Sequence, residues 1–262
     1  MEHFSRLPPI DISCYQWVCS EKDTNLWQRQ ALAGENTWVL KPKERREMFL
    51  GGHISLSVPT TLDDIRRAAE EVWRRLRFEH PEISLASSCD DGGKCLIEHR
   101  TPRDDDEVRA WAKRTVIVKA SLQRVSFSDA RSAISQRKPG KGDPTFVYLY
   151  VQACTTNPRT TSIGFTFHVD HLCADGIGIR ILAHCFFRLL AAELSAVRDQ
   201  VREEINWQRI AENLPPPWTS LMNDNQRTNG AAFDDAVRCR CALILGASVC
   251  VVLSTFRFST FI

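Results

Sequence analysis

The stretch FTFHVDHLCADGIG, residues Phe165 to Gly178, decides how the rest of the chain is interpreted. Its first half alternates apolar and polar side chains, which is the period-two pattern of a half-buried strand. By that alternation His171 shares one face of the strand with Phe165, Phe167 and Val169. The sequence Ala-Asp-Gly-Ile-Gly then indicates a turn, after which an apolar helical pattern begins. A histidine at this position is either a core residue with a backbone partner or a reactive group where the core opens to a cleft.

The remaining sequence mixes strand and helix patterns. Residues 1–50 are expected to hold strand-like and irregular structure. Further strands are expected at 51–58, 83–86, 94–99, 146–153 and 162–170, helices at 62–79, 104–118 and 177–197, and a loop at 128–144. The last helix is expected to bury a stripe that includes Ile181 and Leu182. This order predicts an α/β (α+β) fold with a mixed β-sheet flanked by helices.

The helix that begins at Leu62 carries the strongest local pattern. Thr61 is predicted to be its N-cap, with two aspartates in the first turn, where the helix dipole favours negative charge. Apolar residues then recur at spacings of three and four as far as Leu76, which gives one apolar face. The helix is expected to stop before His80-Pro81, because proline disfavours helical backbone in the residue before it.

The composition excludes several classes of protein. The chain has 262 residues, 43% of them hydrophobic and 25% charged, with a net charge of +2. This balance gives no argument for nucleic acid or an anionic membrane as a partner. The N-terminal residues lack a basic start followed by an apolar core, so a cytoplasmic location is expected and the ten cysteines are expected to be free thiols. Cys173, inside the quoted stretch, is expected to be a packing residue.

The sequence does not match other common motifs of catalysis, dinucleotide binding or metal binding. The chain has no G-x-S-x-G elbow, and Gly176-x-Gly178 lacks the third glycine of a dinucleotide-binding loop. A metal shared by His168, His171 and Asp175 is not expected, because the two histidines fall on opposite strand faces.

What remains is His-x-x-x-Asp-Gly, formed by His171, Asp175 and Gly176 on a strand-to-helix turn. It resembles the active-site signature of the chloramphenicol-acetyltransferase-like superfamily. That superfamily includes plant BAHD acyltransferases, fungal trichothecene-type O-acetyltransferases and peptide-synthetase condensation domains. The stretch 62–81 resembles the first helix of the superfamily, and INWQRIAENLPPPW at 205–218 is similar to a segment of fungal secondary-metabolite acyltransferases. The resemblance covers roughly residues 35 to 235 and is closest to the trichothecene-type enzymes.

The resemblance implies one acyltransferase lobe and a mechanism. His171 would be the general base that takes a proton from a hydroxyl or amine of a small-molecule acceptor as it attacks an acyl-CoA thioester. Acetyl-CoA would be the co-substrate, with no bound cofactor and no metal. Asp175 would point away from the substrate and hold the loop, commonly through an arginine, or cap the following helix. Gly176 would leave room beside the histidine. A monomer is expected.

Two alternative functions stay open. Asp170 stands where condensation domains usually carry a first histidine, which favours a stand-alone acyltransferase over a condensation-type domain that uses a carrier-protein thioester. The second alternative is an inactive remnant that acts as a binding protein.

The end of the sequence changes character. Residues 1–237 are expected to form the lobe, and 238–262 a divergent apolar tail where a second lobe is truncated. Two alternatives for the tail are a buried strand or helix and a membrane anchor. The anchor is less favoured, because only 16 uncharged residues run from Cys241 to Phe256, against about 20 for a spanning helix.

Overall fold

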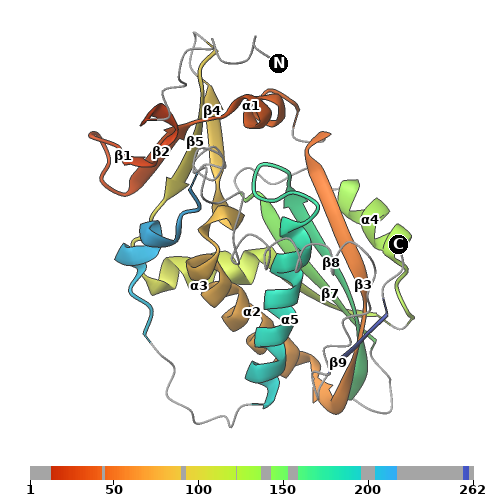
Figure 1. Cartoon of the computed structure of the whole chain (residues 1–262). Helices are drawn as coiled ribbons and strands as arrows, with labels where there is room; N and C mark the ends of the chain where they lie inside the picture. Colours follow the sequence, from red (N-terminus) through yellow and green to blue (C-terminus); the bar gives the residue numbers. More distant parts are fainter. Residues whose placement is uncertain are drawn as a thin grey trace, which may run out of the picture.

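The computed structural model describes residues 13–42, 45–89, 93–121, 123–136, 143–152, 159–195 and 204–216, and the backbone of 256–259. The described strands form a four-stranded sheet in the order β1-β2-β5-β4 and a five-stranded sheet in the order β6-β7-β8-β3-β9 (Figure 1). The strands are β1 Val18–Cys19, β2 Leu26–Gln30, β3 Glu47–Thr61, β4 Ala86–Cys89, β5 Cys95–Arg100, β6 Val116–Ser121, β7 Thr145–Gln152, β8 Arg159–Asp170 and β9 Phe256–Ser259. The helices are α1 Ala33–Val39, α2 Leu62–Glu79, α3 Asp105–Thr115, α4 Phe127–Ser135 and α5 Gly178–Ser195, with 3-10 turns η2 Ser13–Tyr15, η4 Pro81–Ser84 and η5 Trp207–Asn213.

The larger sheet is mixed, which confirms the predicted fold class. β6 runs parallel to β7, whereas β7, β8, β3 and β9 pair antiparallel. β3 and β8 form the longest ladder, from Glu47 opposite Asp170 to Thr61 opposite Arg159, with an irregularity between Ser55 and Thr60. β9 pairs with β3 at the edge of the sheet. The predicted division at residue 237 stays a prediction, because 217–255 lie outside the described residues.

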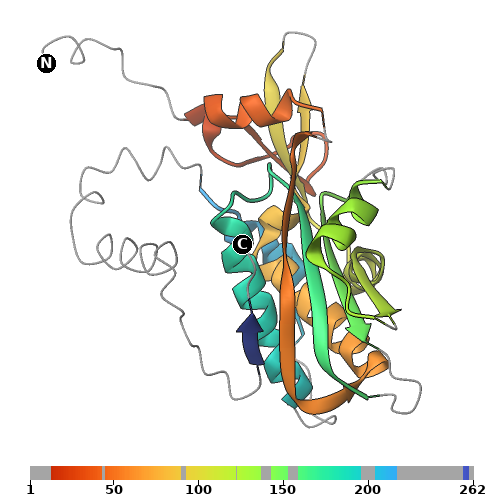
Figure 2. The ribbon, with the colours of Figure 1, turned by 90° about the vertical axis from the view of Figure 1, so that its right-hand side faces the viewer.

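Helices cover both faces of this sheet. Figure 2 shows α5 on one side of β3 and β8 and α4 on the other. Phe167 of β8 is fully buried and meets Phe186 of α5 edge-on, with ring centroids 5.4 Å apart. Trp73 of α2 meets the same Phe186 ring at 6.0 Å. The core face of β8 is therefore packed by aromatic rings from two helices, which fixes the position of the turn that follows the strand.

Helix α2 confirms its prediction. The Thr61 hydroxyl accepts a hydrogen bond from the backbone N–H of Asp64 at 3.2 Å, and the helix ends at Glu79 with His80 as C-cap. In the described part of the chain, no helix combines the length and apolar character needed to cross a membrane.

Five predictions of local structure are wrong. The strand expected at 83–86 begins only at Ala86, because Pro81–Ser84 form the 3-10 turn η4. The expected loop at 128–144 contains α4, which Ser126 caps. The helix expected to reach residue 118 ends at Thr115, where the β-branched run from Val116 forms β6. Residues 33–39 form α1 instead of strand-like structure. Ile181 of α5 is 41% exposed, because the helix instead buries a face that includes Ile179.

The expectation of free thiols is wrong for two cysteines. Cys89 and Cys95 stand directly opposite each other in the β4–β5 pair and form a disulfide. The register of the hairpin brings the two side chains within bonding distance. The prediction of free thiols considered only the cellular compartment and not this local geometry. Cys173 is buried as expected, and this burial raises the pKa of its thiol well above the ordinary range.

His99 of β5 makes the free energy of unfolding depend on pH. Its side chain is fully buried, and burial, together with the positive charge of Arg77, lowers the pKa of His99 to about 3. The unfolded chain takes up this proton near pH 6.5 and the folded chain does not. The stabilising contribution is therefore complete above about pH 6.5 and falls by about 1.4 kcal/mol per pH unit as the pH drops toward 3.

We expect His99→Gln to remove this slope. The free energy of unfolding, measured by urea titration at several pH values between 4 and 8, should fall less steeply below pH 6.5 in the variant. Above pH 7 the two proteins should differ by a constant offset. Identical slopes for the two proteins would contradict a buried neutral imidazole.

Candidate active site

His171 lies in the turn that directly follows β8. The strand ends at Asp170, opposite Glu47, and residues 171–173 form the turn. The backbone N–H of His171 donates to the carbonyl oxygen of Arg46 at 2.7 Å, which ties the turn to the residue before β3. His171 therefore stands one residue beyond the strand, at the end of the β3–β8 ladder, and is half-buried.

The imidazole of His171 stacks on the indole of Trp38 in α1. The ring centroids are 3.7 Å apart and the planes differ by 10°. The ammonium of Lys41 lies 3.9 Å from the centroid of the same indole. The stack of Trp38 on His171 joins residues 133 positions apart, and the motif spacing gives no signal for it.

Asp170 organises the same turn. Its carboxylate forms an ion pair with Arg46 at 2.9 Å, and both side chains are almost fully buried. Oδ1 of Asp170 accepts the backbone N–H of Leu172 at 2.9 Å, and the Asp170 carbonyl accepts the N–H of Cys173 at 2.8 Å. A buried carboxylate with a cation and a backbone donor is well satisfied. The sequence pattern marks Asp170 only as a difference from the condensation domains, which carry a histidine there. It gives no signal for Arg46.

Asp175 caps the N-terminus of α5. Its Oδ1 accepts the backbone N–H groups of Ile177 at 3.0 Å and Gly178 at 2.6 Å, and its carbonyl accepts the N–H of Ile179 at 3.0 Å. These bonds satisfy donors that the first turn of a helix leaves free. Among the described residues no arginine pairs with Asp175; Arg46 pairs with Asp170 instead.

We expect Asp175→Ala to destabilise the chain by about 1 kcal/mol through the lost cap, whereas Asp175→Asn should retain most of the stability. Thermal unfolding followed by circular dichroism measures both variants. Equal loss in the two variants would point to a role for the negative charge beyond capping.

The two glycines of the turn differ in their surroundings. Among the described residues, a Cβ added to Gly176 would meet nothing within 4 Å, and the residue does not have a positive φ angle. A Cβ at Gly178 would lie 3.2 Å from the Cβ of Ala174 and 3.3 Å from Oδ1 of Asp175. The described geometry thus gives Gly178, and not Gly176, a steric reason to be glycine.

The family model described as 15-O-acetyltransferase Tri3 matches residues 7–254. The chain belongs to this family. Trichothecene 15-O-acetyltransferase TRI3 of Fusarium sporotrichioides is 26% identical over an alignment of 244 residues that covers 88% of this chain and 47% of the relative. Trichothecene O-acetyltransferase TRI3 of Trichoderma arundinaceum is 26% identical over an alignment of 235 residues that covers 84% of this chain and 45% of the relative.

A solved structure of the Fusarium sporotrichioides TRI3 enzyme supports the fold. It matches with a TM-score of 0.70 at 24% identity, over 91% of this chain and 49% of that chain. The chain therefore spans about half the length of the Tri3-family relatives it matches.

His168 lies on the other face of β8. Its Nε2 lies 3.0 Å from a carboxylate oxygen of Glu47, and its ring stacks on Phe49 with centroids 4.8 Å apart. Burial lowers the pKa of His168. His168 and His171 thus have separate partners, and no group of three metal-ligating side chains occurs within the described ranges.

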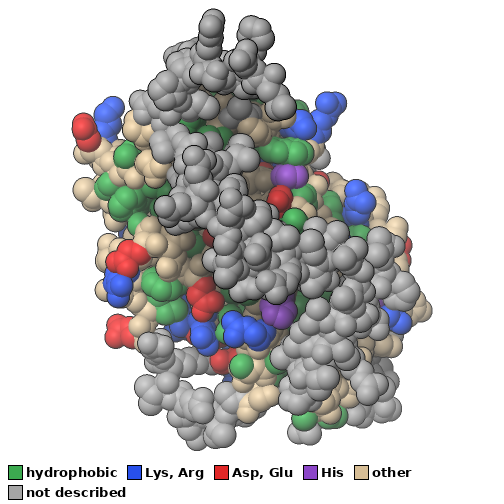
Figure 3. All heavy atoms as spheres, in the orientation of Figure 1, with side chains coloured by type: hydrophobic (Ala, Val, Ile, Leu, Met, Phe, Trp, Pro, Cys, Tyr) green, Lys and Arg blue, Asp and Glu red, His purple; other side chains and the backbone are tan. Residues whose placement is uncertain are grey.

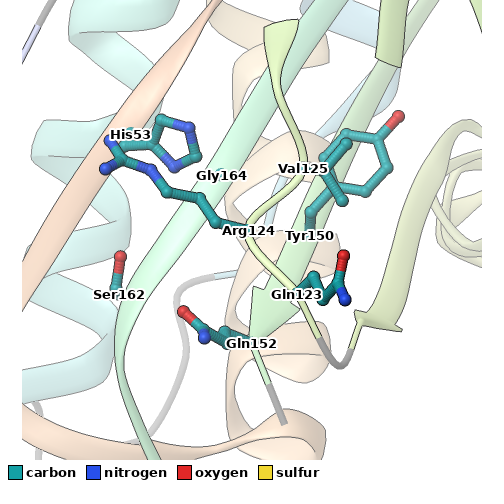
Figure 4. A pocket seen from close by; sticks show the side chains of 8 residues that line it. All are labelled: His53, Gln123, Arg124, Val125, Tyr150, Gln152, Ser162 and Gly164. Carbon is teal, nitrogen blue, oxygen red and sulfur yellow. The ribbon is translucent and has the colours of Figure 1, made fainter. Parts of the chain in front are cut away.

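A concave region lies elsewhere, on the sheet face away from α2. Figure 4 shows a small polar groove in which Arg124 reaches across Gly164 toward the ring of His53, with Tyr150 and Ser162 among the lining residues. Burial and the nearby charge of Arg124 lower the pKa of His53. Gly164 lies seven residues before His171 along β8, so this groove is separate from the turn that carries the motif.

The surface charges of the lobe are mixed. On the face drawn in Figure 3, basic and acidic side chains are interspersed over the described residues. This agrees with the formal net charge of +2 for the whole chain.

Proposed function

We propose that this chain carries the general base of an acyl-CoA-dependent O-acyltransferase, with His171 in that role. The observation that carries the proposal is the imidazole at the end of the β3–β8 ladder. It is half-buried and stacked on Trp38, in a lobe that belongs to the Tri3 family.

The stacking geometry suits a general base. The two nitrogens of an imidazole lie in the ring plane, so contact with one face leaves their lone pairs and protons at the ring edge. Within the described residues no hydrogen bond engages the ring of His171, whereas His168 is paired with Glu47. A histidine that titrates near neutral pH when unperturbed can accept a proton from an alcohol as it attacks.

The reaction that we propose transfers an acetyl group. The acceptor oxygen attacks the thioester carbonyl of acetyl-CoA while His171 takes the hydroxyl proton, and the CoA thiolate leaves when the tetrahedral intermediate collapses. The imidazolium can return the proton to the departing sulfur. Because the acceptor attacks the thioester directly, no covalent acyl-enzyme forms. CoA is a co-substrate, and the proposal needs no bound cofactor and no metal.

The names of the relatives suggest the acceptor class, a hydroxyl of a trichothecene-like secondary metabolite. The ion pair between Asp170 and Arg46 occupies the position where a condensation domain would carry another histidine. This supports a stand-alone acyltransferase over one that uses a carrier-protein thioester. In the same proposal Asp175 caps α5, and neither Asp175 nor Gly176 touches the reacting atoms.

A turnover assay tests the proposal directly. The chain is incubated with acetyl-CoA and a trichothecene that has a free 15-hydroxyl, and the product is measured by mass spectrometry, because the free cysteine thiols of the chain would add a background to any thiol reagent. An increase in acceptor mass by one acetyl group supports the proposal. No product with any acceptor hydroxyl or acyl-CoA would favour the alternative of an inactive binding protein.

A further inference from the structure

We propose that Trp38 is a positioning residue that sets the ring plane of His171. This inference rests on the proposed function, because it assigns Trp38 a role in the same site. The two rings are nearly parallel, at 10°, with centroids 3.7 Å apart. That separation brings the whole face of the imidazole into van der Waals contact with the indole.

The stack matters because His171 has few other restraints. It follows the last residue of β8, so the strand ladder does not hold its side chain. Many general bases are oriented by a third group that hydrogen-bonds to the distal ring nitrogen. Within the described residues His171 has no such partner. The indole can restrict the rotamers of His171 without engaging either nitrogen, so both stay available for proton transfer.

Arg46 links the two partners of the stack. Its carbonyl accepts the backbone N–H of His171 at 2.7 Å, and its guanidinium pairs with Asp170 at 2.9 Å. The same guanidinium reaches the carbonyl oxygen of Trp38 at 3.4 Å. One almost fully buried arginine thus contacts the backbone of both stacked residues and the side chain of Asp170, the last residue of β8.

The helix that carries Trp38 is also anchored. The carboxylate of Glu35 accepts the backbone N–H of Leu32 at 2.8 Å and pairs with the buried Arg29 at 2.6 Å. Because α1 is fixed at its start by this ion pair and at its end by Arg46, the indole presents a defined surface to the imidazole. A rigid support is what distinguishes a positioning residue from a casual contact.

The expected effect follows from the sensitivity of proton transfer to alignment. A displacement of about 1 Å can lower a rate about 100-fold. We expect Trp38→Leu to lower kcat about 10- to 100-fold with little change in KM, because the lost restraint concerns the base. Trp38→Phe keeps an aromatic face and should restore most of kcat.

The test compares Trp38→Phe, Trp38→Leu and the control Leu40→Ala in two measurements. Leu40 follows α1 directly and is 67% exposed, so its truncation alters the same segment without touching the stack. The first measurement is kcat and KM for acetyl transfer. The second is the NMR shift of the His171 ring protons, which the indole ring current should move upfield in the parent chain, in Leu40→Ala and partly in Trp38→Phe, but not in Trp38→Leu.

The outcomes separate the two proposals. Turnover in the parent chain with unchanged kcat in Trp38→Leu overturns the positioning role. Ring-proton shifts that do not respond to Trp38→Leu overturn the stack itself. No turnover in the parent chain overturns the proposed function, and with it any role of Trp38 in that reaction, whereas the NMR measurement still reports on the contact. Low kcat in Trp38→Leu, recovery in Trp38→Phe and parent-like Leu40→Ala support the proposal.

Discussion

Replacing His171 by alanine is expected to lower the rate of acetyl transfer by about 10²- to 10⁴-fold, the range in which general bases contribute. The loss should fall on kcat, because the base acts on the proton in the transition state and contributes little to ground-state binding. His171→Gln is the sharper variant. Glutamine retains polarity and part of the contact with Trp38 but cannot accept and carry the proton, so its kcat should be as low as that of alanine.

His168→Gln provides the matched control. His168 lies three residues before His171 on the opposite face of β8, paired with Glu47. Its replacement changes the same strand without changing the proposed base, so kcat should stay within a few-fold of the parent. Product formation by His171→Gln at the parent rate would show that His171 is not the general base, even if the chain is an acetyltransferase. Equal losses in the two variants would indicate damage to the strand.

Replacing Glu71 by glutamine should destabilise the lobe by about 3 kcal/mol, the low end of the cost of breaking a buried ion pair. The Glu71 carboxylate accepts hydrogen bonds from Nε and Nη2 of Arg74, the latter at 2.6 Å, and both side chains are buried on α2. Arg109 lies 3.5 Å from the other carboxylate oxygen. Without the charge of Glu71, the guanidinium of Arg74 keeps Asp105 as its one ionic partner among the described residues. Because Asp105 remains, the low end of the range applies.

The same helix offers the control. Asp63 and Arg66 form an ion pair at 3.0 Å with the same i, i+3 spacing, but the side chain of Asp63 is 89% exposed. Asp63→Asn should change the free energy of unfolding by no more than about 0.5 kcal/mol. Urea denaturation of the two variants measures the contrast. A Glu71 variant as stable as the Asp63 variant would show that water reaches the buried pair.

Segments with strong local patterns could be predicted from the sequence. Helix α2 has a capping threonine, an apolar face of period 3.6 and a proline one residue beyond its C-cap, so local chemistry and burial agree. Short elements were missed because their patterns span too few residues. Helix α4 has nine residues and buries only Ala130 and Ile134, and its polar composition looks like a loop until it is seen against the sheet. There Gly51 of β3 leaves the space that the ring of Phe127 fills, since a Cβ at Gly51 would overlap that ring.

Local sequence patterns account for the features within the candidate site. The end of β8, the turn, the start of α5 and the His-x-x-x-Asp-Gly spacing fall within fourteen consecutive residues, and their geometry follows from alternation, turn residues and capping. The surroundings of the imidazole, in contrast, depend on contacts between distant segments. The β3–β8 register places Arg46 beside Asp170, and α1 carries Trp38 onto His171. These contacts join residues more than 120 positions apart, and they form because strand pairing and core packing bring the two segments together, which no local pattern encodes.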